Sequence, residues 1–271
     1  QVVNVDGTAP CQGVAGRFAN ETTVTDTDLL PCHADEVWIL DVDSIAAGRG
    51  DNAQTHTPRT WETLSYQAGT GWVEPETFES ATNGSHWPIL ADRMSDDRMI
   101  CFIDSGSSGA QMTNIRASSY TTLVTAAGCE NIAGVLMHGG ANDISAGAAT
   151  TVSAAAWETE CEAVADSIAT QWSGAVVRFA ILGDVTNLTS KDAEAGYVRE
   201  GALNAVASNA NCEFGAVSWW QQYDDGLHPK SDQQLIDLAN EWWHIIRTGA
   251  SNPPEMVQVT HNTAKTEITI Q

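Results

Sequence analysis

The stretch WILDVDSIAAGRGDN, residues 38–52, begins like a buried strand and then changes character. Trp38 to Leu40 are apolar, and acids, a serine and small residues follow them. One interpretation is a turn between a strand and a helix, with Asp43 or Ser44 capping the helix. The other is a nucleophilic Ser44 at the carboxyl end of a strand, where open α/β sheets bind their ligands. Alone, the stretch favours the first interpretation, and the rest of the chain decides between them.

Continuous apolar runs recur along the chain. Such runs are typical of parallel strands that are covered on both faces. They are VWIL (37–40), MICFID (99–104), IAGVLMHGG (132–140), VVRFAILG (176–183) and CEFGAVSWW (212–220). We therefore predict a strand in each run.

Helical patterns lie between and after these runs. The clearest, residues 153–172, has large side chains at spacings of three and four. These are Trp157, Cys161, Val164, Ile168 and Trp172. Residues 231–249 form another, with Ser231 as its start signal and Gly249 as its end. Strands that alternate with helices predict an α/β fold, a three-layer α/β/α sandwich with a central, mostly parallel sheet of flavodoxin-like type.

The composition limits the partners. Of the 271 residues 42% are hydrophobic, which is enough to bury a full core. The formal net charge of −23 repels nucleic acid and anionic lipid, so we predict no nucleic acid and no membrane as partners. No run approaches the about 18 apolar residues of a membrane span. The acids are scattered and lysine occurs at only three positions, a bias expected of proteins from salty water.

The cysteines and the start of the chain bear on its location. The chain begins at Gln1 without a methionine or a signal-like apolar run, which indicates a processed protein, secreted or extracellular. Its 6 cysteines permit up to three disulfides and show no zinc-site spacing. We expect Cys11 to pair with Cys32, because both flank a polar, turn-rich segment with little core of its own. Cys101 lies in an apolar run and is expected to be a buried thiol.

Three parts of the chain differ in character. Residues 1–33 are rich in Gly, Thr, Asn and Asp and predict an irregular arm or hairpin, which a disulfide could staple. Residues 34–250 carry the alternating pattern and form the main domain, with an insert at 61–94. Residues 251–271 alternate like an edge hairpin, either a β extension of the domain or the start of a truncated β domain.

Unusual loops follow several of the predicted strands. DSGSSGA (104–110) and HGGANDI (138–144) each combine glycines with polar side chains, and DDGLHPK (224–230) stands near the last helix. The carboxyl ends of parallel strands meet at one edge of a sheet, so these loops and Ser44 are expected to converge.

Their side chains suit acyl transfer. A serine hydroxyl needs a base, which His228 can supply to Ser44. The imidazole needs an orienting carboxylate, and Asp225 fits the spacing better than its neighbour Asp224. No further carboxylates gather at ligand spacing around Asp41, so we predict no metal and no cofactor.

Donors for an oxyanion are also present. The backbone N–H groups of Ser44 and Gly109 and the side-chain amide of Asn142 suit this role. Glycine at 109 would let the backbone approach the substrate closely, and Gly106 is its rival. His138, which ends a predicted strand nearby, is expected to pack behind the site.

Together the four loops resemble the four blocks of the SGNH/GDSL hydrolase superfamily, in the same order. Val42-Asp43-Ser44 resembles the Gly-Asp-Ser block, and Gly109 resembles the glycine block. Gly140 to Asp143 matches the G-x-N-D block, and Asp225 to His228 matches the D-x-x-H block. The resemblance covers roughly residues 35 to 250 and implies a serine esterase of that fold. Val42 departs from the pattern, because the family usually has glycine there.

The insert at 61–94 bears on the substrate. It is similar to the equivalent region of sialate O-acetylesterase-like and other carbohydrate esterases, which implies an O-acetyl group on a glycan as substrate. Trp61, Trp72 and Trp87 could then stack on sugar rings, although each could instead anchor the core or a loop. The alternatives are a non-catalytic glycan-binding or adhesion domain of the same fold, and a lipase- or thioesterase-like hydrolase of non-sugar esters.

Overall fold

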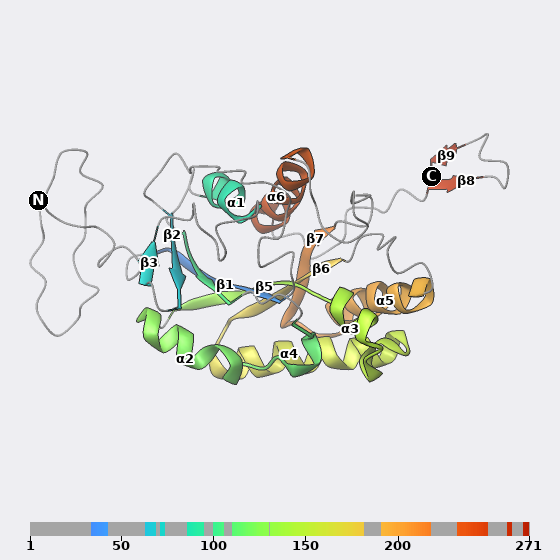
Figure 1. Cartoon of the computed structure of the whole chain (residues 1–271), viewed down its shortest axis with the longest axis horizontal. Helices are drawn as coiled ribbons and strands as arrows, with labels where there is room; N and C mark the ends of the chain where they lie inside the picture. Colours follow the sequence, from blue (N-terminus) through green and yellow to red (C-terminus); the bar gives the residue numbers. More distant parts are fainter. Residues whose placement is uncertain are drawn as a thin grey trace, which may run out of the picture.

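A seven-stranded sheet with helices on both faces forms the centre of the molecule (Figure 1). The chain is represented by a computed structural model. It describes residues 34–42, 63–68, 71–73, 86–94, 100–105, 110–129, 131–181, 191–217, 232–248, 259–261 and 268–270.

The strand order in the sheet is β3-β2-β4-β1-β5-β6-β7. The strands are β1 (Glu36–Val42), β2 (Thr63–Gln67), β3 (Gly71–Val73), β4 (Ile100–Asp104), β5 (Ile132–His138), β6 (Val176–Ile181) and β7 (Cys212–Val217). All neighbouring strands pair in parallel except β2 and β3, which are antiparallel. Each of the five predicted runs contains a strand, which confirms the predicted α/β fold.

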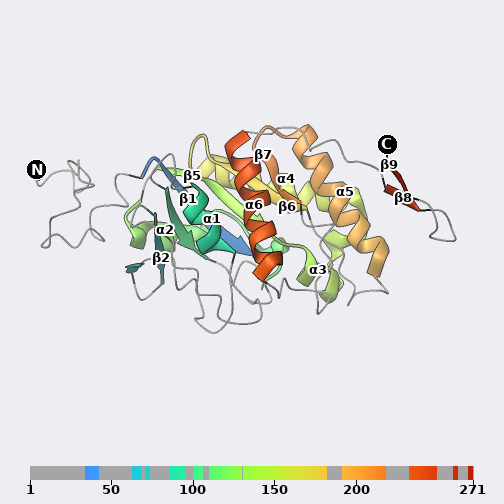
Figure 2. The same cartoon turned by 90° about the horizontal axis from the view of Figure 1, so that it is seen from above.

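Helices cover both faces of the sheet, which completes the predicted three-layer sandwich. They are α1 (Trp87–Met94), α2 (Ser118–Ala127), α3 (Ala141–Ala146), α4 (Ala154–Gln171), α5 (Asp192–Ser208) and α6 (Asp232–Thr248), with short 3₁₀ turns η4 (Met112–Asn114) and η5 (Ala149–Thr151). Figure 1 shows α1 and α6 on one face and α2, α4 and α5 on the other. Seen from above in Figure 2, α1 and α6 lie in front of the sheet and cover part of it.

Two hydrophobic clusters, one on each face of the sheet, explain why the strand sequences are continuous apolar runs. Along β1 the side chains alternate, so that Val37 and Ile39 join the cluster under α2, α4 and α5. Trp38 and Leu40 join the cluster under α1 and α6. Both faces of the strand are therefore removed from water, and no polar alternation survives in its sequence.

Helix α4 shows how the predicted helical pattern is used. Its N-cap, Ser153, accepts a hydrogen bond from the Ala156 N–H with its side chain. Four of the five large side chains of the pattern are buried: Trp157, Cys161, Val164 and Ile168. The fifth, Trp172, is the C-cap and is only partly buried.

The direction in which the chain adds strands to the sheet reverses at the central strand β1. The chain first adds β2, β3 and β4 on one side of β1 and then β5, β6 and β7 on the other. Near the carboxyl ends, Leu40 pairs with Asp104 of β4 and Val42 pairs with His138 of β5. In open α/β sheets ligands bind at such a switch point.

The described cysteines narrow the number of disulfides. Cys101, Cys129, Cys161 and Cys212 are buried thiols that form no disulfide, so at most one of the three permitted disulfides remains. Each lies in the hydrophobic core, and burial raises the pKa of Cys129 to about 11 and that of Cys212 to about 12. Cys101 is the buried thiol that its apolar run predicts. Cys11 and Cys32 lie outside the described residues.

The ends of the chain are described only in part. The predicted arm at 1–33 lies outside the described residues. Within 251–271, β8 (Val259–His261) and β9 (Ile268–Ile270) pair as two antiparallel strands. Among the helices that the structure describes, none combines the length and apolarity needed to cross a membrane.

Candidate active site

The candidate site lies at the carboxyl ends of β1, β4 and β5. Of the predicted catalytic and oxyanion-hole residues, Asn142 is the one that the structure describes. Ser44, Gly109, Asp225 and His228 lie outside the described residues. So do their rivals Gly106 and Asp224, and Trp61 of the insert.

The turn between β5 and α3 sets the position of Asn142. Gly140 has a φ of 115°, a conformation that residues with a side chain rarely adopt. A Cβ atom there would also lie 2.8 Å from Val198 Cγ1 and 3.3 Å from the Trp157 ring. Glycine is therefore required for strand β5 to turn directly into α3, with Asn142 in its first turn.

The amide nitrogen of Asn142 is a buried donor that finds no partner in the described part of the chain. Its Nδ2 atom is shielded from solvent and has no hydrogen-bond acceptor among the described residues. Leaving such a group unsatisfied costs about 1–3 kcal/mol. A donor kept in this state at a strand end is suited to an acceptor that arrives with a ligand.

Asp143, the next residue, connects α3 to the segment after β4. Its side chain is fully buried, and its carboxylate accepts hydrogen bonds from the Met112 N–H at 3.0 Å and the Thr113 N–H at 3.5 Å. Burial raises the pKa of Asp143, while these backbone bonds act in the opposite direction. The sequence predicted no role for this carboxylate, because its partners are 31 and 30 residues away.

The same segment is joined to β1. The Ser105 N–H donates to the Leu40 carbonyl at 2.9 Å and so extends the parallel pairing past the end of β4. Further along, the Tyr120 hydroxyl donates to the carboxylate of Asp41. Burial, together with the charge of Asp41, raises the pKa of Tyr120 well above its usual value. Asp41 thus anchors α2 to the strand that leads to Ser44.

Two buried histidines lie on the face of the sheet that α1 and α6 cover, opposite to α2. His138 ends β5 and is fully buried, as expected for a residue that packs behind the site. His86, immediately before α1, is also fully buried, and its ring centroid lies 4.0 Å from that of Trp87. Burial, and to a lesser degree His138, lowers the pKa of His86 well below its usual value. The sequence did not single out His86, because nothing in its local pattern relates it to β5.

The two described tryptophans of the insert, Trp72 and Trp87, do not form a common rim for a substrate. Trp87 is 0% exposed and packs against Trp242 of α6, with ring centroids 5.8 Å apart. The prediction that it can face a sugar ring is therefore wrong, since it fills the core between α1 and α6. Trp72 is half-buried, and its Nε1–H donates to the Ala127 carbonyl at 3.0 Å, which makes it an anchor for β3 against α2.

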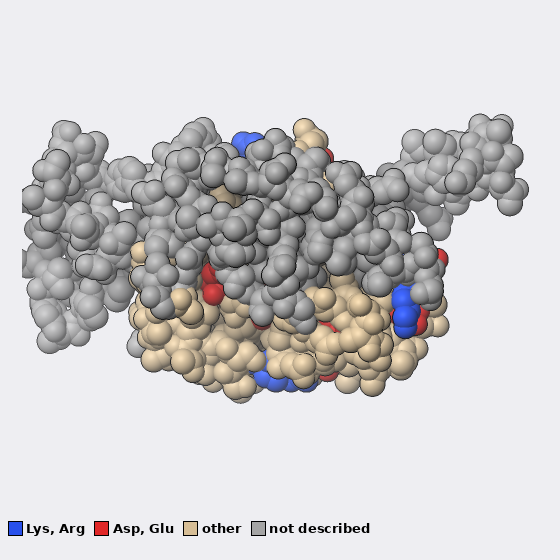
Figure 3. Space-filling model, in the orientation of Figure 1, with Lys and Arg blue, Asp and Glu red and all other residues tan. Residues whose placement is uncertain are grey.

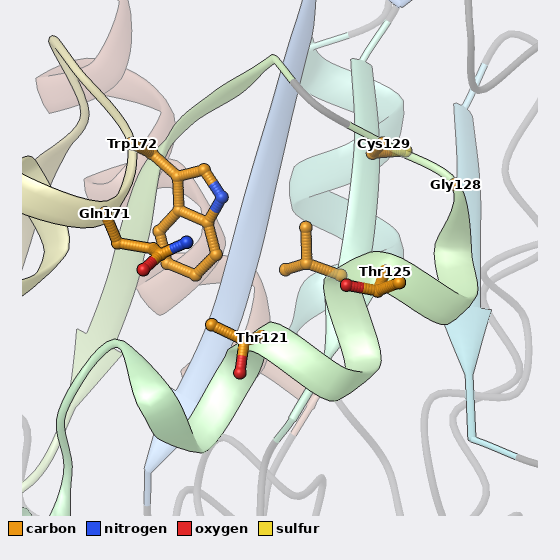
Figure 4. Close-up of a pocket in the computed structure, with 7 residues that line it drawn as sticks. Thr121, Thr125, Gly128, Cys129, Gln171 and Trp172 are labelled. Atoms are coloured by element: carbon orange, nitrogen blue, oxygen red, sulfur yellow. The ribbon is translucent and has the colours of Figure 1, made fainter.

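A cavity of about 340 Å³ lies away from this site, between the C-terminal ends of α2 and α4 (Figure 4). It is lined by Thr121, Val124, Thr125, Gly128, Cys129, Gln171 and Trp172. The ends of α2 and α4 lead into the starts of β5 and β6, so this cavity lies at the amino edge of the sheet. It is therefore separate from the candidate active site at the carboxyl edge.

No family model matches the chain, and no curated protein matches its sequence. Solved structures do match its fold. A protein of Arabidopsis thaliana superposes with a TM-score of 0.57 at 15% identity, over 78% of this chain and 98% of that one. A carbohydrate acetylesterase from Xanthomonas citri gives a TM-score of 0.55 at 12% identity, over 78% of this chain and 55% of that one.

A family 3 carbohydrate esterase of Clostridium thermocellum gives a TM-score of 0.50 at 15% identity, over 79% of this chain and 97% of that one. At such identities the likeness concerns the arrangement of strands and helices alone. The layers, the parallel sheet and the position of Asn142 after β5 agree with the four-block resemblance in the sequence. The chain therefore has the fold of the SGNH hydrolases.

Proposed function

We propose that the protein is a serine ester hydrolase in which Ser44 is the nucleophile, His228 the base and Asp225 the residue that orients the base. The observation that carries the proposal is the buried Nδ2 of Asn142, which has no acceptor among the described residues, at the carboxyl edge of an SGNH-hydrolase fold. An unpaired donor at this place is what an acyl-transfer site needs for its oxyanion.

Chain connectivity supports the grouping of the proposed residues. Ser44 is two residues beyond Val42, and two residues span at most about 7 Å. Val42 pairs with His138, which leads through Gly140 to Asn142. Gly109 directly precedes the described segment that Asp143 holds. These links support the proposal that the nucleophile and the oxyanion donors lie near one edge of the sheet.

The proposed base belongs to the connection that follows β7. Residues 218–231 run from the end of β7 to the start of α6 at Asp232 and contain both Asp225 and His228. His228 is four residues before Asp232, a span of at most about 14 Å. A connection that leaves the carboxyl end of a parallel strand begins at the same edge as Asn142.

The reaction then proceeds through an acyl-enzyme. Ser44 Oγ attacks the ester carbonyl carbon while His228 takes the hydroxyl proton. The negative carbonyl oxygen accepts hydrogen bonds from the Ser44 N–H, the Gly109 N–H and Asn142 Nδ2. When the C–O bond breaks, the imidazolium returns its proton to the leaving alcohol. Water, deprotonated by His228, attacks the acyl group in the same way and releases the acid and free Ser44.

The proposed substrate is an O-acetyl group on a carbohydrate. Two of the solved structures with this fold are described as carbohydrate esterases, and the insert at 61–94 resembles the same class in sequence. A chain with a net charge of −23 repels anionic polymers, which favours neutral acetylated glycans. With Trp87 buried and Trp72 serving as an anchor, Trp61 is the remaining candidate for a sugar platform.

Acetate release tests the proposal. The full chain is incubated with p-nitrophenyl acetate, p-nitrophenyl butyrate, acetylated xylan and acetylated chito-oligosaccharides, with Ser44→Ala as the matched control. We expect release from the acetyl esters and the glycans by the wild-type protein and none by the variant. Activity on the synthetic esters without any glycan would overturn the carbohydrate assignment, and binding of glycans without acetate release would indicate a binding domain instead.

A further inference from the structure

We propose that Asp143 is a positioning residue that fixes the segment following Gly109 to α3, and so helps to align the proposed oxyanion donors Gly109 and Asn142. The inference rests on the proposed function and goes beyond it, because it assigns a role to a side chain that does not touch the substrate.

The hydrogen bonds of Asp143 replace a helix cap. The 3₁₀ turn η4 begins after Gln111, which has an extended backbone and caps no N–H group with its side chain. The N–H groups at the start of such a turn need acceptors, because they have none within it. The Asp143 carboxylate supplies them at 3.0 Å to Met112 and 3.5 Å to Thr113. The start of η4 is thus built on a side chain from α3.

Both sides of this contact lie next to proposed donors. Asp143 adjoins Asn142 in the first turn of α3, whose path is set by the positive φ of Gly140. Met112 follows Gly109 by three residues. A shift of the carboxylate would therefore change the separation between Met112 and Asn142, and Met112 is three residues from the proposed donor Gly109. Oxyanion donors act through preorganisation, so a misplacement of this kind lowers the rate of the chemical step.

Other contacts hold the later part of the segment to different elements. The Ala117 N–H donates to Ser167 Oγ of α4 at 2.7 Å, and Arg116 forms an ion pair with Glu160 of α4 at 2.6 Å. The Ser167 bond is of the same kind as the Asp143 bonds, a backbone N–H of this segment donating to a side-chain oxygen. It lies further from Gly109 and leads to α4 instead of α3. Ser167→Ala is therefore a matched control for Asp143→Asn.

The substitution Asp143→Asn keeps the size of the side chain but weakens the contact. An amide has one acceptor oxygen, so it can serve one of the two N–H groups while its NH₂ faces the other. We expect kcat for p-nitrophenyl acetate to fall about 10- to 100-fold with KM changed less than about twofold, the division expected when only transition-state contacts are lost. Affinity for an arylboronic acid, which mimics the tetrahedral intermediate, should fall in parallel. Ser167→Ala should leave all three quantities within about twofold of wild type.

Amide hydrogen exchange of the full chain tests the contact without any activity. In Asp143→Asn the amides of Met112 and Thr113 should exchange faster, and that of Ala117 should not. If these two amides exchange as in wild type, the contact is not the one that orders the loop and the proposal is overturned. Should Asp143→Asn not fold, Asp143→Ser, which keeps one acceptor oxygen in a smaller side chain, undergoes the same measurements.

The outcomes separate this inference from the proposed function. An active wild type whose Asp143→Asn variant keeps its kcat overturns the positioning role alone. Equal losses of kcat in Asp143→Asn and Ser167→Ala would make the carboxylate one more packing contact and would also overturn it. A wild-type protein that hydrolyses no ester overturns the proposed function, and the positioning role with it.

Discussion

At the scale of single residues, Asn142 and Asp143 show two opposite uses of a buried polar group. The Asn142 amide is left without an acceptor among the described residues, whereas the Asp143 carboxylate is satisfied by two backbone N–H groups. The first state costs stability and the second offsets the cost of burying a charge. This difference between neighbouring side chains supports the proposed roles, in which Asn142 binds the oxyanion and Asp143 holds the structure.

Replacing Asn142 should separate activity from stability. We expect Asn142→Ala to lower kcat by about 10²-fold with little change in KM, as for the loss of one oxyanion donor. Because the variant removes an unsatisfied buried donor, its Tm should be equal to or higher than that of wild type. Steady-state kinetics and thermal unfolding measure both. An effect confined to KM would make Asn142 a ground-state contact, and a much lower Tm would mean that its amide is paired in the folded protein.

At the scale of elements, the sequence best predicted the strands that are buried on both faces. The five apolar runs each contain a strand, because covered parallel strands leave no polar alternation. β2, which lies between the edge strand β3 and β4, was not predicted, because its sequence keeps polar residues such as Thr63 and Gln67. Trp87 was misjudged, since an aromatic side chain near a turn looks the same in sequence whether it meets solvent or a helix packed from the far end of the chain.

The candidate site divides in the same way. The proposed role of Asn142 comes from its local block, because a glycine turn followed by an amide is contained in a few residues. The contacts of Asp143 and the approach of His86 to His138 could not be predicted, because each joins elements that only the packed sheet brings together. Local pattern thus suggests candidate groups for the chemistry, and tertiary packing decides which groups hold them.

His86, immediately before α1, should make the stability of the protein depend on pH. The pKa of His86 is lowered in the folded protein, so below the unfolded value of about 6.5 the unfolded chain binds a proton that the folded one does not. The free energy of unfolding should therefore fall as pH drops from 7 to 5, with a slope of up to about 1.4 kcal/mol per pH unit from this group. Urea unfolding of wild type and of His86→Gln measures the difference. Equal pH dependence in the two proteins would contradict it.

At the scale of the whole molecule, the dominant feature is an excess of acids, 35 against 12 basic residues. On the face shown in Figure 3 the described Lys and Arg residues lie apart and form no continuous patch. Such a surface repels itself, and added salt screens the repulsion.

Salt should therefore stabilise the protein. We expect Tm to rise when NaCl is raised from 0.1 M to 1 M, because the Debye length falls from about 10 Å to about 3 Å. Thermal unfolding followed by circular dichroism measures the change, and sucrose of equal osmolarity controls for exclusion of cosolute from the surface. A Tm that is unchanged or lower in 1 M NaCl would show that self-repulsion does not limit stability.

Covalent labelling of the nucleophile tests the central claim most directly. A fluorophosphonate reacts when Ser44 Oγ attacks its phosphorus, fluoride leaves and His228 takes the hydroxyl proton. Intact-mass and peptide mass spectrometry should find one adduct per chain, located at Ser44, in the folded wild type. The adduct should be absent from Ser44→Ala and nearly absent from His228→Ala. A wild-type protein that forms no adduct, or an adduct on another residue that persists in Ser44→Ala, would contradict the account.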